Sequence, residues 1–274
     1  MLLLTAESLP HEDLDTALLA AALTERGAQA TVLVWSTSDA WPIDADLAIV
    51  RTTWDYTFRR DEFLEVLEAA PVTVANPTNV LRWNSHKGYL VELAAAGVPV
   101  IPTVLLRRGD PASLPDIDAA RIIVKPTIAA GARGVGLFEA DAPAAAEHLA
   151  DLLTRVDVLV QPFEPSVHDG ERSLLYFGGR YSHAVRKVPA VSDFRVHTRY
   201  GGHQLPHEAT AAELAVAQAA LDSVPSDLLY ARVDLVGTAA APLVMELELI
   251  EPEIFLPMAD GSADRLAEAV LATL

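Results

Sequence analysis

Two segments near the carboxyl end of the chain carry the side chains best suited to chemistry. LLYARVDLV and PLVMELELI flank GTAAA, a pattern that predicts a β-hairpin. A turn near residue 239 or 240 pairs Asp234 with Glu246 and Arg232 with Glu248, so that all four side chains share one face. The opposite face is then apolar, with Ala231, Val233 and Leu235 against Met245, Leu247 and Leu249.

Three carboxylates on one face repel each other unless a cation neutralises them, by up to ~1 kcal/mol for each facing pair. Mg²⁺ is typically held by one or two carboxylates together with substrate phosphates. Asp234, Glu246 and Glu248 therefore indicate a platform for a nucleotide and a metal ion. The hairpin alone leaves an alternative open, which is a solvated charged face with an Arg–Glu pair.

A glycine-rich stretch, KPTIAAGARGVG from Lys125 to Gly136, lies between two predicted strands. Dinucleotide and Walker A loops need a helix after their glycines, and neither pattern is present here. A glycine-rich loop between strands is instead typical of a flap whose N–H groups close over phosphates, with Lys125 neutralising them from the preceding strand. A plain mobile hairpin is the alternative reading.

The remaining basic and imidazole side chains are less specific. Arg186, Lys187, Arg195 and Arg199 form a basic stretch before Gly201-Gly202, which suggests an anion site or an ordinary exposed surface. Lys87, near the start of a predicted helix, has nothing local to distinguish it. No histidine pair has metal-ligand spacing, so we expect structural or peripheral roles for His183, His197, His203 and His207.

The first third of the chain alternates strands with helices. Strands are predicted at Met1–Thr5, Ala30–Trp35, Asp44–Arg51 and VTVAN, and helices at His11–Arg26 and Asp61–Ala70. This order favours a small doubly wound parallel sheet, with ligands at the carboxyl ends of its strands, where RTTWDY (51–56) lies. A further helix, capped by Asn84 or Ser85, should end near Gly97-Val98-Pro99.

The rest of the chain predicts two α+β units. Strands at Arg121–Pro126, LFEA and Val156–Phe163 surround a helix at Pro143–Arg155. ERSLLYF and RYSHAVRKV flank Gly178-Gly179 as a second hairpin, and a closing helix covers Ser262–Leu274. We therefore expect an α/β protein with domains at 1–98, 99–162 and 163–274.

Composition excludes several classes of protein. The 274 residues have a formal charge of −18, 51% hydrophobic residues and no cysteine, which indicates a folded chain without disulfides or thiolate chemistry. The acidic balance disfavours nucleic acid as a partner. The opening of the chain has no basic region, and no stretch of the sequence approaches the length of an apolar membrane span. We therefore expect no membrane span and a cytoplasmic location.

The order of these motifs resembles the ATP-grasp superfamily of carboxylate–amine ligases. Lys87, Lys125, the strand–loop–strand glycines, QPF and RVD…MELE occur in that family's order over essentially the whole chain. The spacing from Gln161 to Glu171 and from Arg195 to Gly201-Gly202 is similar to that in bacterial glutathione synthetases. RTTWDY, SHAVRK, DFRV and ELELIEPEIF look closer to the subgroup with the D-cycloserine-forming cyclo-ligase.

The resemblance implies a role for each matching position. ATP contacts would come from Lys87, Lys125, the flap Ala130–Gly136 with Ala130, Gly131 and Gly134, and the hinge Gln161, Pro162, Phe163 and Glu164, with Glu171 at the ribose. Asp234, Glu246 and Glu248 would hold Mg²⁺ or Mn²⁺, and Arg195 and Arg232 would act on the transferring phosphoryl group. Substrate contacts would come from Arg51, Trp54, Asp55, Tyr56, Arg186, Gly201 and Gly202.

The implied reaction is phosphorylation of a substrate carboxylate by ATP, followed by attack of a nitrogen nucleophile with release of ADP and phosphate. Glu248 in place of the usual Asn, His197 in place of another Asn, and Ser173 in place of a basic residue argue against glutathione or glutamate as the substrate and leave the ATP site unaffected. A small amino acid derivative, cyclised as for O-ureido-D-serine, is favoured. A phosphotransferase and a non-catalytic ATP-binding module are the alternatives, and a homo-oligomer is compatible with the family.

Overall fold

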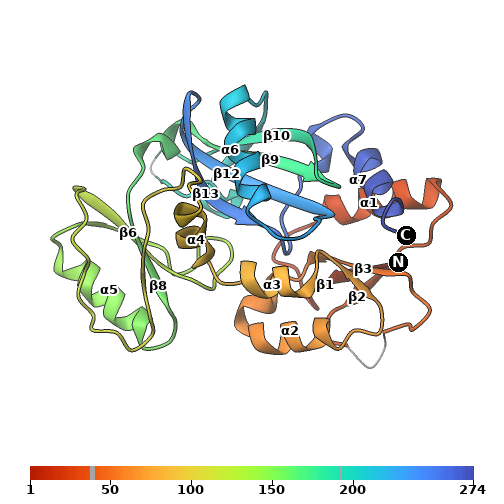
Figure 1. The fold of residues 1–274 in the computed structure, drawn as a ribbon, viewed down its shortest axis with the longest axis horizontal. Helices are drawn as coiled ribbons and strands as arrows, with labels where there is room; N and C mark the ends of the chain where they lie inside the picture. The colour runs from red at the N-terminus through yellow and green to blue at the C-terminus, as the bar shows by residue number, and fades with distance from the viewer. Residues whose placement is uncertain (38–40, 192) are drawn as a thin grey trace.

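The computed structural model describes residues 1–37, 41–191 and 193–274, which form three β-sheets with helices packed on them (Figure 1). The sheets follow one another along the chain, as the sequence predicts. The fold is α/β, and the sequence-predicted doubly wound unit, small α+β unit and larger α+β unit each contain one sheet. No helix within the described ranges has the length and apolar character needed to cross a membrane.

The first sheet is parallel, with the order β2-β1-β3-β4. Its strands are β1 (Leu2–Thr5), β2 (Thr31–Val34), β3 (Leu47–Thr52) and β4 (Thr73–Ala75). Helices α1 (Leu14–Glu25) and α2 (Arg60–Glu68) lie between them. Every residue of β3 is buried because helices and the neighbouring sheet cover both of its faces, which is typical of a parallel sheet. RTTWDY does lie at the carboxyl end of β3, where a short 3-10 helix η2 (Trp54–Phe58) follows.

The second sheet, called the lid sheet here, is antiparallel with the order β5-β8-β6-β7. Its strands are β5 (Val104–Leu106), β6 (Arg121–Pro126), β7 (Gly136–Glu139) and β8 (Val158–Pro162). Helix α5 (Pro143–Leu153) buries Ala145, Leu149, Leu152 and Leu153 against one face. Because β6 and β7 pair directly, the glycine-rich stretch is a strand–loop–strand connection, as predicted.

The third sheet, called the C-terminal sheet, has the order β11-β10-β9-β12-β13. Its strands are β9 (Glu171–Phe177), β10 (Arg180–Val188), β11 (His203–His207), β12 (Tyr230–Thr238) and β13 (Ala241–Glu248). Gly178 and Gly179, both at positive φ, form the predicted turn between β9 and β10. Helices α6 (Ala211–Asp222) and α7 (Ser262–Leu271) and the 3-10 helices η3 (Pro165–Asp169), η4 (Thr198–Tyr200) and η5 (Leu256–Met258) complete the unit.

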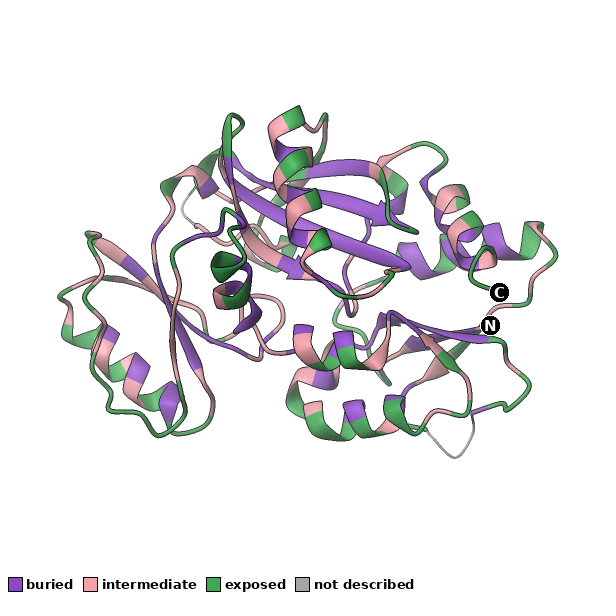
Figure 2. Cartoon of the chain, viewed as in Figure 1, coloured by how far each residue is buried: buried purple, intermediate pink, exposed green. Residues whose placement is uncertain are grey.

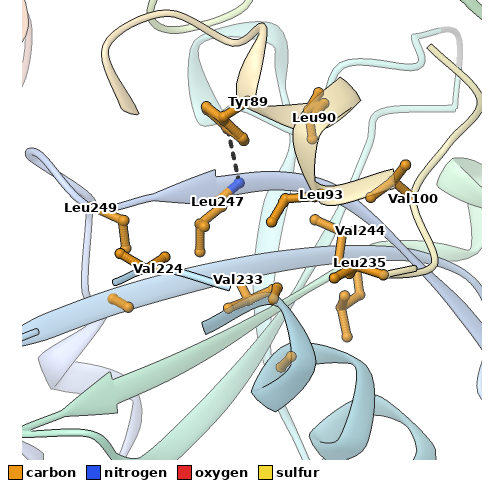
Figure 3. Close-up of a cluster of buried hydrophobic side chains, with 14 of the residues drawn as sticks. Tyr89, Leu90, Leu93, Val100, Val224, Val233, Leu235, Val244, Leu247 and Leu249 are labelled. Carbon is orange, nitrogen blue, oxygen red and sulfur yellow. Dashed lines mark hydrogen bonds between the residues drawn. The ribbon is translucent and has the colours of Figure 1, made fainter. Parts of the chain in front are cut away.

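The two faces of the C-terminal sheet have different partners. One face packs Val233, Leu235 and Leu247 against α6 and against helix α4 (Tyr89–Ala95) (Figure 3). The central strands β9 and β12 are buried along nearly their whole length (Figure 2). The Tyr89 hydroxyl also accepts a hydrogen bond from the Leu247 N–H at 3.0 Å. The other face packs Leu175, Phe177 and Val185 against α7 and the first sheet at one end, and leaves its other end polar.

The helix predicted to be capped by Asn84 or Ser85 begins later than expected, which corrects that prediction. Helix α3 (Thr78–Asn84) ends at Asn84, and α4 begins only after Gly88. Asn84 is buried and donates to the Leu247 carbonyl at 2.7 Å while accepting from the Leu249 N–H at 2.9 Å. The sequence predicted a helix cap at Asn84, but its side chain instead binds the backbone of Leu247 and Leu249.

Candidate functional site

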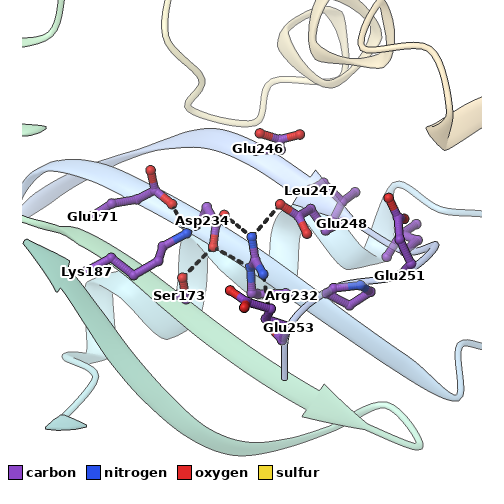
Figure 4. Close-up of polar contacts among 12 residues, drawn as sticks. Glu171, Ser173, Lys187, Arg232, Asp234, Glu246, Leu247, Glu248, Glu251 and Glu253 are labelled. Carbon is purple, nitrogen blue, oxygen red and sulfur yellow. Dashed lines mark hydrogen bonds and ion pairs between the residues drawn. The ribbon is translucent and has the colours of Figure 1, made fainter. Parts of the chain in front are cut away.

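A continuous set of charged and polar side chains occupies the polar end of the C-terminal sheet, on one face (Figure 4). Strand pairing places Arg232 opposite Glu248 and Asp234 opposite Glu246, which confirms the predicted register. Strands β9 and β10 extend the set sideways, since Ser173 pairs with Asp234 and Lys187 with Glu171. We call these seven residues the polar face: Glu171, Ser173, Lys187, Arg232, Asp234, Glu246 and Glu248.

Two β-bulges, one between β9 and β10 and one between β12 and β13, produce this alignment. In the β12–β13 hairpin the extra residue is Met245, because Asp234 faces Glu246 but Leu235 already faces Val244. A bulge moves the following side chains to the opposite face. Met245 therefore joins an apolar cluster with Phe163 and Val236. The expectation that Met245 packs on the same face as Leu247 is wrong for this reason.

Asp234 is the centre of the polar face. Its two carboxylate oxygens accept from Arg232 Nε at 3.0 Å and Nη2 at 2.9 Å, from Lys187 Nζ at 3.0 Å, and from Ser173 Oγ at 2.6 Å. Burial alone would raise the pKa of Asp234, but Arg232 and Lys187 hold it well below its ordinary value. Asp234 is thus a fixed anion, and removing a partner would leave a buried charge uncompensated.

The other carboxylates of the polar face are less strongly neutralised. Burial raises the pKa of Glu171 to about 8 although Lys187 forms an ion pair with it. Burial, together with repulsion from Glu246 and Asp234, raises the pKa of Glu248 to about 7 although Arg232 pairs with it. Because burial is the main cause of both raised values, a cation bound beside these carboxylates would stabilise their charged forms.

Lys87 joins the polar face to the flap. Its Nζ lies 2.8 Å from Glu246 Oε1 and donates to the Ala129 carbonyl, also at 2.8 Å. Burial would lower the pKa of Lys87, but Glu246 raises it above the ordinary value. The structure therefore brings together Lys87 and Glu246, which sequence reasoning placed in one site solely by resemblance.

Lys125, on β6 of the lid sheet, interacts electrostatically with Glu246 and Glu171 of the polar face. It is 7% exposed, and the described residues provide no hydrogen-bond or ion-pair partner for its ammonium group. Burial lowers the pKa of Lys125 to about 8, and the charge of Lys87 lowers it further against the attraction of Glu246. A buried ammonium without a partner is stabilised by any anion that reaches it.

The three carboxylates predicted to bind metal offer the oxygen donors that Mg²⁺ prefers. In the residues that the structure describes, however, no group of three acidic or imidazole side chains is gathered as a ready metal site. Lys87 and Arg232 take the contacts of Glu246 and Glu248 instead. The donor chemistry fits a magnesium ion, provided that these pairs rearrange when it binds.

The flap lies against the first sheet's unit. Arg133 Nη2 donates to Thr57 Oγ1 at 2.7 Å, and its guanidinium carbon lies 3.8 Å from the centre of the Phe58 ring. Gly131 and Gly134 adopt positive φ, a conformation that glycine reaches without strain, whereas Ala130 precedes them on the loop. The flap thus spans from the lid sheet to η2.

The predicted hinge lies at the end of β8. Gln161 is buried and donates to Thr103 Oγ1 at 2.7 Å, Pro162 ends the strand, and Glu164 accepts from the Ser166 N–H at 3.0 Å. Phe163 belongs to an apolar cluster with Ile101, Val167 and Val236. This cluster also contacts Ile123 and Leu137 of the lid sheet and Leu243 and Met245 of β13. An apolar patch therefore lies between the two sheets, beside the polar face.

The arginine-rich segment adopts a tight loop. Arg195 donates to both carboxylate oxygens of Asp193, at 3.0 and 2.7 Å, and its guanidinium carbon lies 3.6 Å from the centre of the Tyr200 ring. Gly201 has a φ of +83°, and a side chain on Gly202 would come within 2.1 Å of the Val196 carbonyl. The two glycines therefore close the loop that holds Arg195. Arg186 is exposed, and the neighbouring Lys187 enters the polar face in its place.

The RTTWDY residues divide between core and site. Asp55 accepts from Trp35 Nε1 at 2.8 Å and from Arg59 at 3.1 Å, and Tyr56 packs against Phe63. Burial raises the pKa of Tyr56 well above its ordinary value, and so do the charges of Glu251, Glu246 and Glu248. Its hydroxyl therefore lies in the field of the site carboxylates.

A loop that sequence reasoning did not single out by residue completes the site. Three consecutive carbonyls, those of Glu251, Pro252 and Glu253, accept hydrogen bonds from Trp54 Nε1 at 3.2 Å, Arg51 Nη2 at 3.1 Å and Arg232 Nη1 at 3.0 Å. Burial raises the pKa of Glu251 to about 8, with repulsion from Glu248 adding to it. The acidic run ELELIEPEIF was the available signal, but its contacts come from distant strands.

Comparison with known proteins gives two family matches. Residues 1–79 match the family described as "D-cycloserine synthetase DcsG, N-terminal domain". Residues 113–252 match "Prokaryotic glutathione synthetase, ATP-grasp domain". The second match includes the flap, the hinge and the whole polar face.

Individual relatives agree with these matches. The chain is 34% identical to the cycloserine biosynthesis protein DcsG of Streptomyces lavendulae over 97% of this chain and 95% of that one. It is 27% identical to a glutathione synthetase of Parasynechococcus marenigrum (strain WH8102), over 76% and 69% of the two chains. The crystal structure of D-cycloserine synthetase DcsG superposes with a TM-score of 0.89 at 32% identity, covering 99% and 98%. A D-alanine–D-alanine ligase from Bacillus anthracis with ATP shares the fold, at a TM-score of 0.73 and 14% identity, covering 99% and 96%.

Proposed function

Since this chain belongs to the ATP-grasp family of carbon–nitrogen ligases, we propose that it phosphorylates the carboxylate of a small amino acid derivative with ATP and then closes a ring through a nitrogen of the same molecule. The observation that carries the proposal is the polar face, with Lys87 and Lys125 above its carboxylates. This arrangement supplies fixed charges of both signs around one space, which phosphoryl transfer requires.

The two sheets supply complementary parts of an ATP site. The apolar patch around Phe163, Leu243 and Met245 suits an adenine ring, and Gln161 to Glu164 lie at its edge. The polar face begins directly beside this patch, where Lys125 and Lys87 suit the phosphates. The flap N–H groups, among them those of Ala130, Gly131 and Gly134, then cover the phosphates from above.

The charged side chains have distinct roles in the transfer. Lys125 and Lys87 neutralise phosphate oxygens, so that the substrate carboxylate can approach the γ-phosphorus without a large electrostatic barrier. Arg232 stabilises the charge that develops on the acyl phosphate, and Asp234 fixes the plane of its guanidinium through two hydrogen bonds. Arg195 would join them once its guanidinium group releases Asp193 and binds the substrate.

Asp234, Glu246 and Glu248 would hold Mg²⁺, with Mn²⁺ as an alternative ion. When bound, this ion would neutralise phosphate charge and orient the β- and γ-phosphates. The strand register, which places these three carboxylates on one face of the β12–β13 hairpin, supports this assignment. The resemblance places Glu171 at the ribose, and we include this contact in the proposal. In the structure Glu171 forms an ion pair with Lys187.

The substrate class follows from the relatives and from the site. The name of the S. lavendulae relative connects it with cycloserine biosynthesis, and we extend O-ureido-D-serine to this chain as the first substrate to test. The ring of Trp54 and the carboxylate of Glu253 both lie close to His11, and acidic and aromatic side chains of this kind suit a small zwitterion that carries a nitrogen nucleophile.

The test is release of ADP and phosphate from ATP and Mg²⁺ with O-ureido-D-serine, D-serine and D-alanine offered singly. We expect one ADP and one phosphate for each ring product, with O-ureido-D-serine alone of the three giving a ring. A phosphorylated product without free phosphate would indicate a phosphotransferase. ATP binding without ADP release from any of the three would favour a binding module.

A further inference from the structure

One group of side chains beside the polar face has no role in ATP binding. His11 follows β1 and Trp54 follows β3, and these strands are neighbours in the first sheet. From β1 the chain continues to β2 on one side and then crosses to β3 on the other side of β1. The direction of the strand order therefore reverses between β1 and β3. Ligands of doubly wound sheets bind at the carboxyl ends of the strands at such a reversal. The rings of His11 and Trp54 are in contact there, with centroids 4.7 Å apart.

His11 faces a carboxylate without forming a hydrogen bond to it. Its Nε2 lies 3.8 Å from Glu253 Oε1, which is too long for a direct bond. Its Nδ1 lies 3.2 Å from the Glu12 carbonyl, an oxygen that can only accept. In the neutral ring the proton therefore belongs on Nδ1, and Nε2 presents a lone pair. Two acceptors that face each other in this way are suited to a ligand that brings N–H groups.

The backbone of Glu253 is bound to a side chain of the polar face. Its carbonyl accepts from Arg232, whose other nitrogens bind Asp234. The Glu251 carbonyl accepts from Trp54, whose ring His11 contacts at a tilt (Figure 4 shows Glu251, Glu253 and Arg232). His197, two residues from Arg195, also lies near His11, with ring centroids 6.0 Å apart. His11 and Glu253 thus border the space between Trp54 and the proposed acyl phosphate.

We propose that His11 and Glu253 bind the nitrogen nucleophile of the substrate and that His11 Nε2 accepts its proton during ring closure. The inference rests on the proposed function and adds a catalytic base to it. The nitrogen lone pair attacks the acyl carbon, the C–N bond forms, and the C–O bond to the phosphoryl group breaks as phosphate leaves. The proton released by the nitrogen moves to Nε2, and Glu253 stabilises the resulting imidazolium until it loses the proton to water.

The experiment separates carboxylate activation from ring closure. Wild type and His11→Gln are given ATP, Mg²⁺ and O-ureido-D-serine, with and without hydroxylamine, a nucleophile that needs no base and traps an activated carboxylate as a hydroxamate. We expect His11→Gln to form hydroxamate within threefold of the wild-type rate but the ring product about 100-fold or more slowly. Exposed His203, changed to Gln, serves as the matched control and should leave both rates unchanged.

A second variant and a rescue keep the test independent of folding. Glu253→Gln should show the same selective loss, about tenfold, and added imidazole should restore ring closure to His11→Ala. Equal loss of both products, or wild-type ring closure in His11→Gln, overturns the inference. If wild type itself gives no hydroxamate with any of the three amino acids tested above, the proposed function fails as well, which separates the two conclusions.

Discussion

Changing Lys125 to Met will stabilise the protein and abolish most of its activity. The difference between the ordinary lysine pKa of 10.5 and the value of about 8 corresponds to up to about 3 kcal/mol of folding free energy. The methionine side chain fills nearly the same volume without the buried charge. The same change removes a cation from the phosphate site, so ADP formation should fall at least 100-fold.

The pH dependence of this gain has a definite sign. Below pH 8 lysine is charged in both the folded and the unfolded chain, so wild type carries the full penalty and the Met variant its full advantage. Between pH 8 and about 10.5 the folded protein loses the proton first, and the advantage shrinks to zero. Thermal unfolding of both proteins at pH 7 and pH 10.5 measures this. An equally stable variant at pH 7, or one with wild-type turnover, would contradict the assignment of Lys125.

Changing Glu246 to Gln will slow ADP formation by about 100- to 1,000-fold with little effect on folding. Glu246 is a proposed Mg²⁺ ligand and the partner of Lys87, so loss of its charge removes both functions. Its side chain is 26% exposed, and Lys87 keeps the Ala129 carbonyl as a partner. The melting temperature should therefore change by only a few degrees.

Exposed Glu208, changed to Gln, is the matched control for this variant. It should keep wild-type turnover and wild-type affinity for ATP with Mg²⁺, measured by steady-state kinetics and calorimetry. Turnover of the Glu246 variant within threefold of wild type would show that the carboxylates of β13 do not take part in the transfer.

Local patterns in the sequence predicted much of this fold. Alternation of strands and helices gave the first sheet, and Gly178-Gly179 gave the turn between β9 and β10 because both positions need positive φ. The shared face of Asp234 and Glu246 followed from period two, since the carboxylates and the apolar side chains alternate in both strands. These features depend on neighbours a few residues apart, which a single sequence displays.

Bulges and long-range contacts could not be predicted in this way. Counting from the turn at Gly178-Gly179 would place Arg186 opposite Glu171, but an extra residue at Ser182 moves Lys187 there instead. The pairing of His11 with Glu253 joins residues at opposite ends of the chain. Nothing in either local sequence indicates the other, because the loop after β1 and the loop after β13 meet only when the two sheets pack together.

Transfer of oxygen from substrate to phosphate is the most direct measurement of the central claim, that the polar face directs ATP to a substrate carboxylate. O-ureido-D-serine labelled with ¹⁸O in its carboxylate is incubated with ATP, Mg²⁺ and the enzyme, and the released phosphate is examined by ³¹P NMR. We predict one ¹⁸O atom in each phosphate, because the carboxylate oxygen leaves with the phosphoryl group. Unlabelled phosphate formed together with ADP would mean that water attacks ATP, and the account would be wrong.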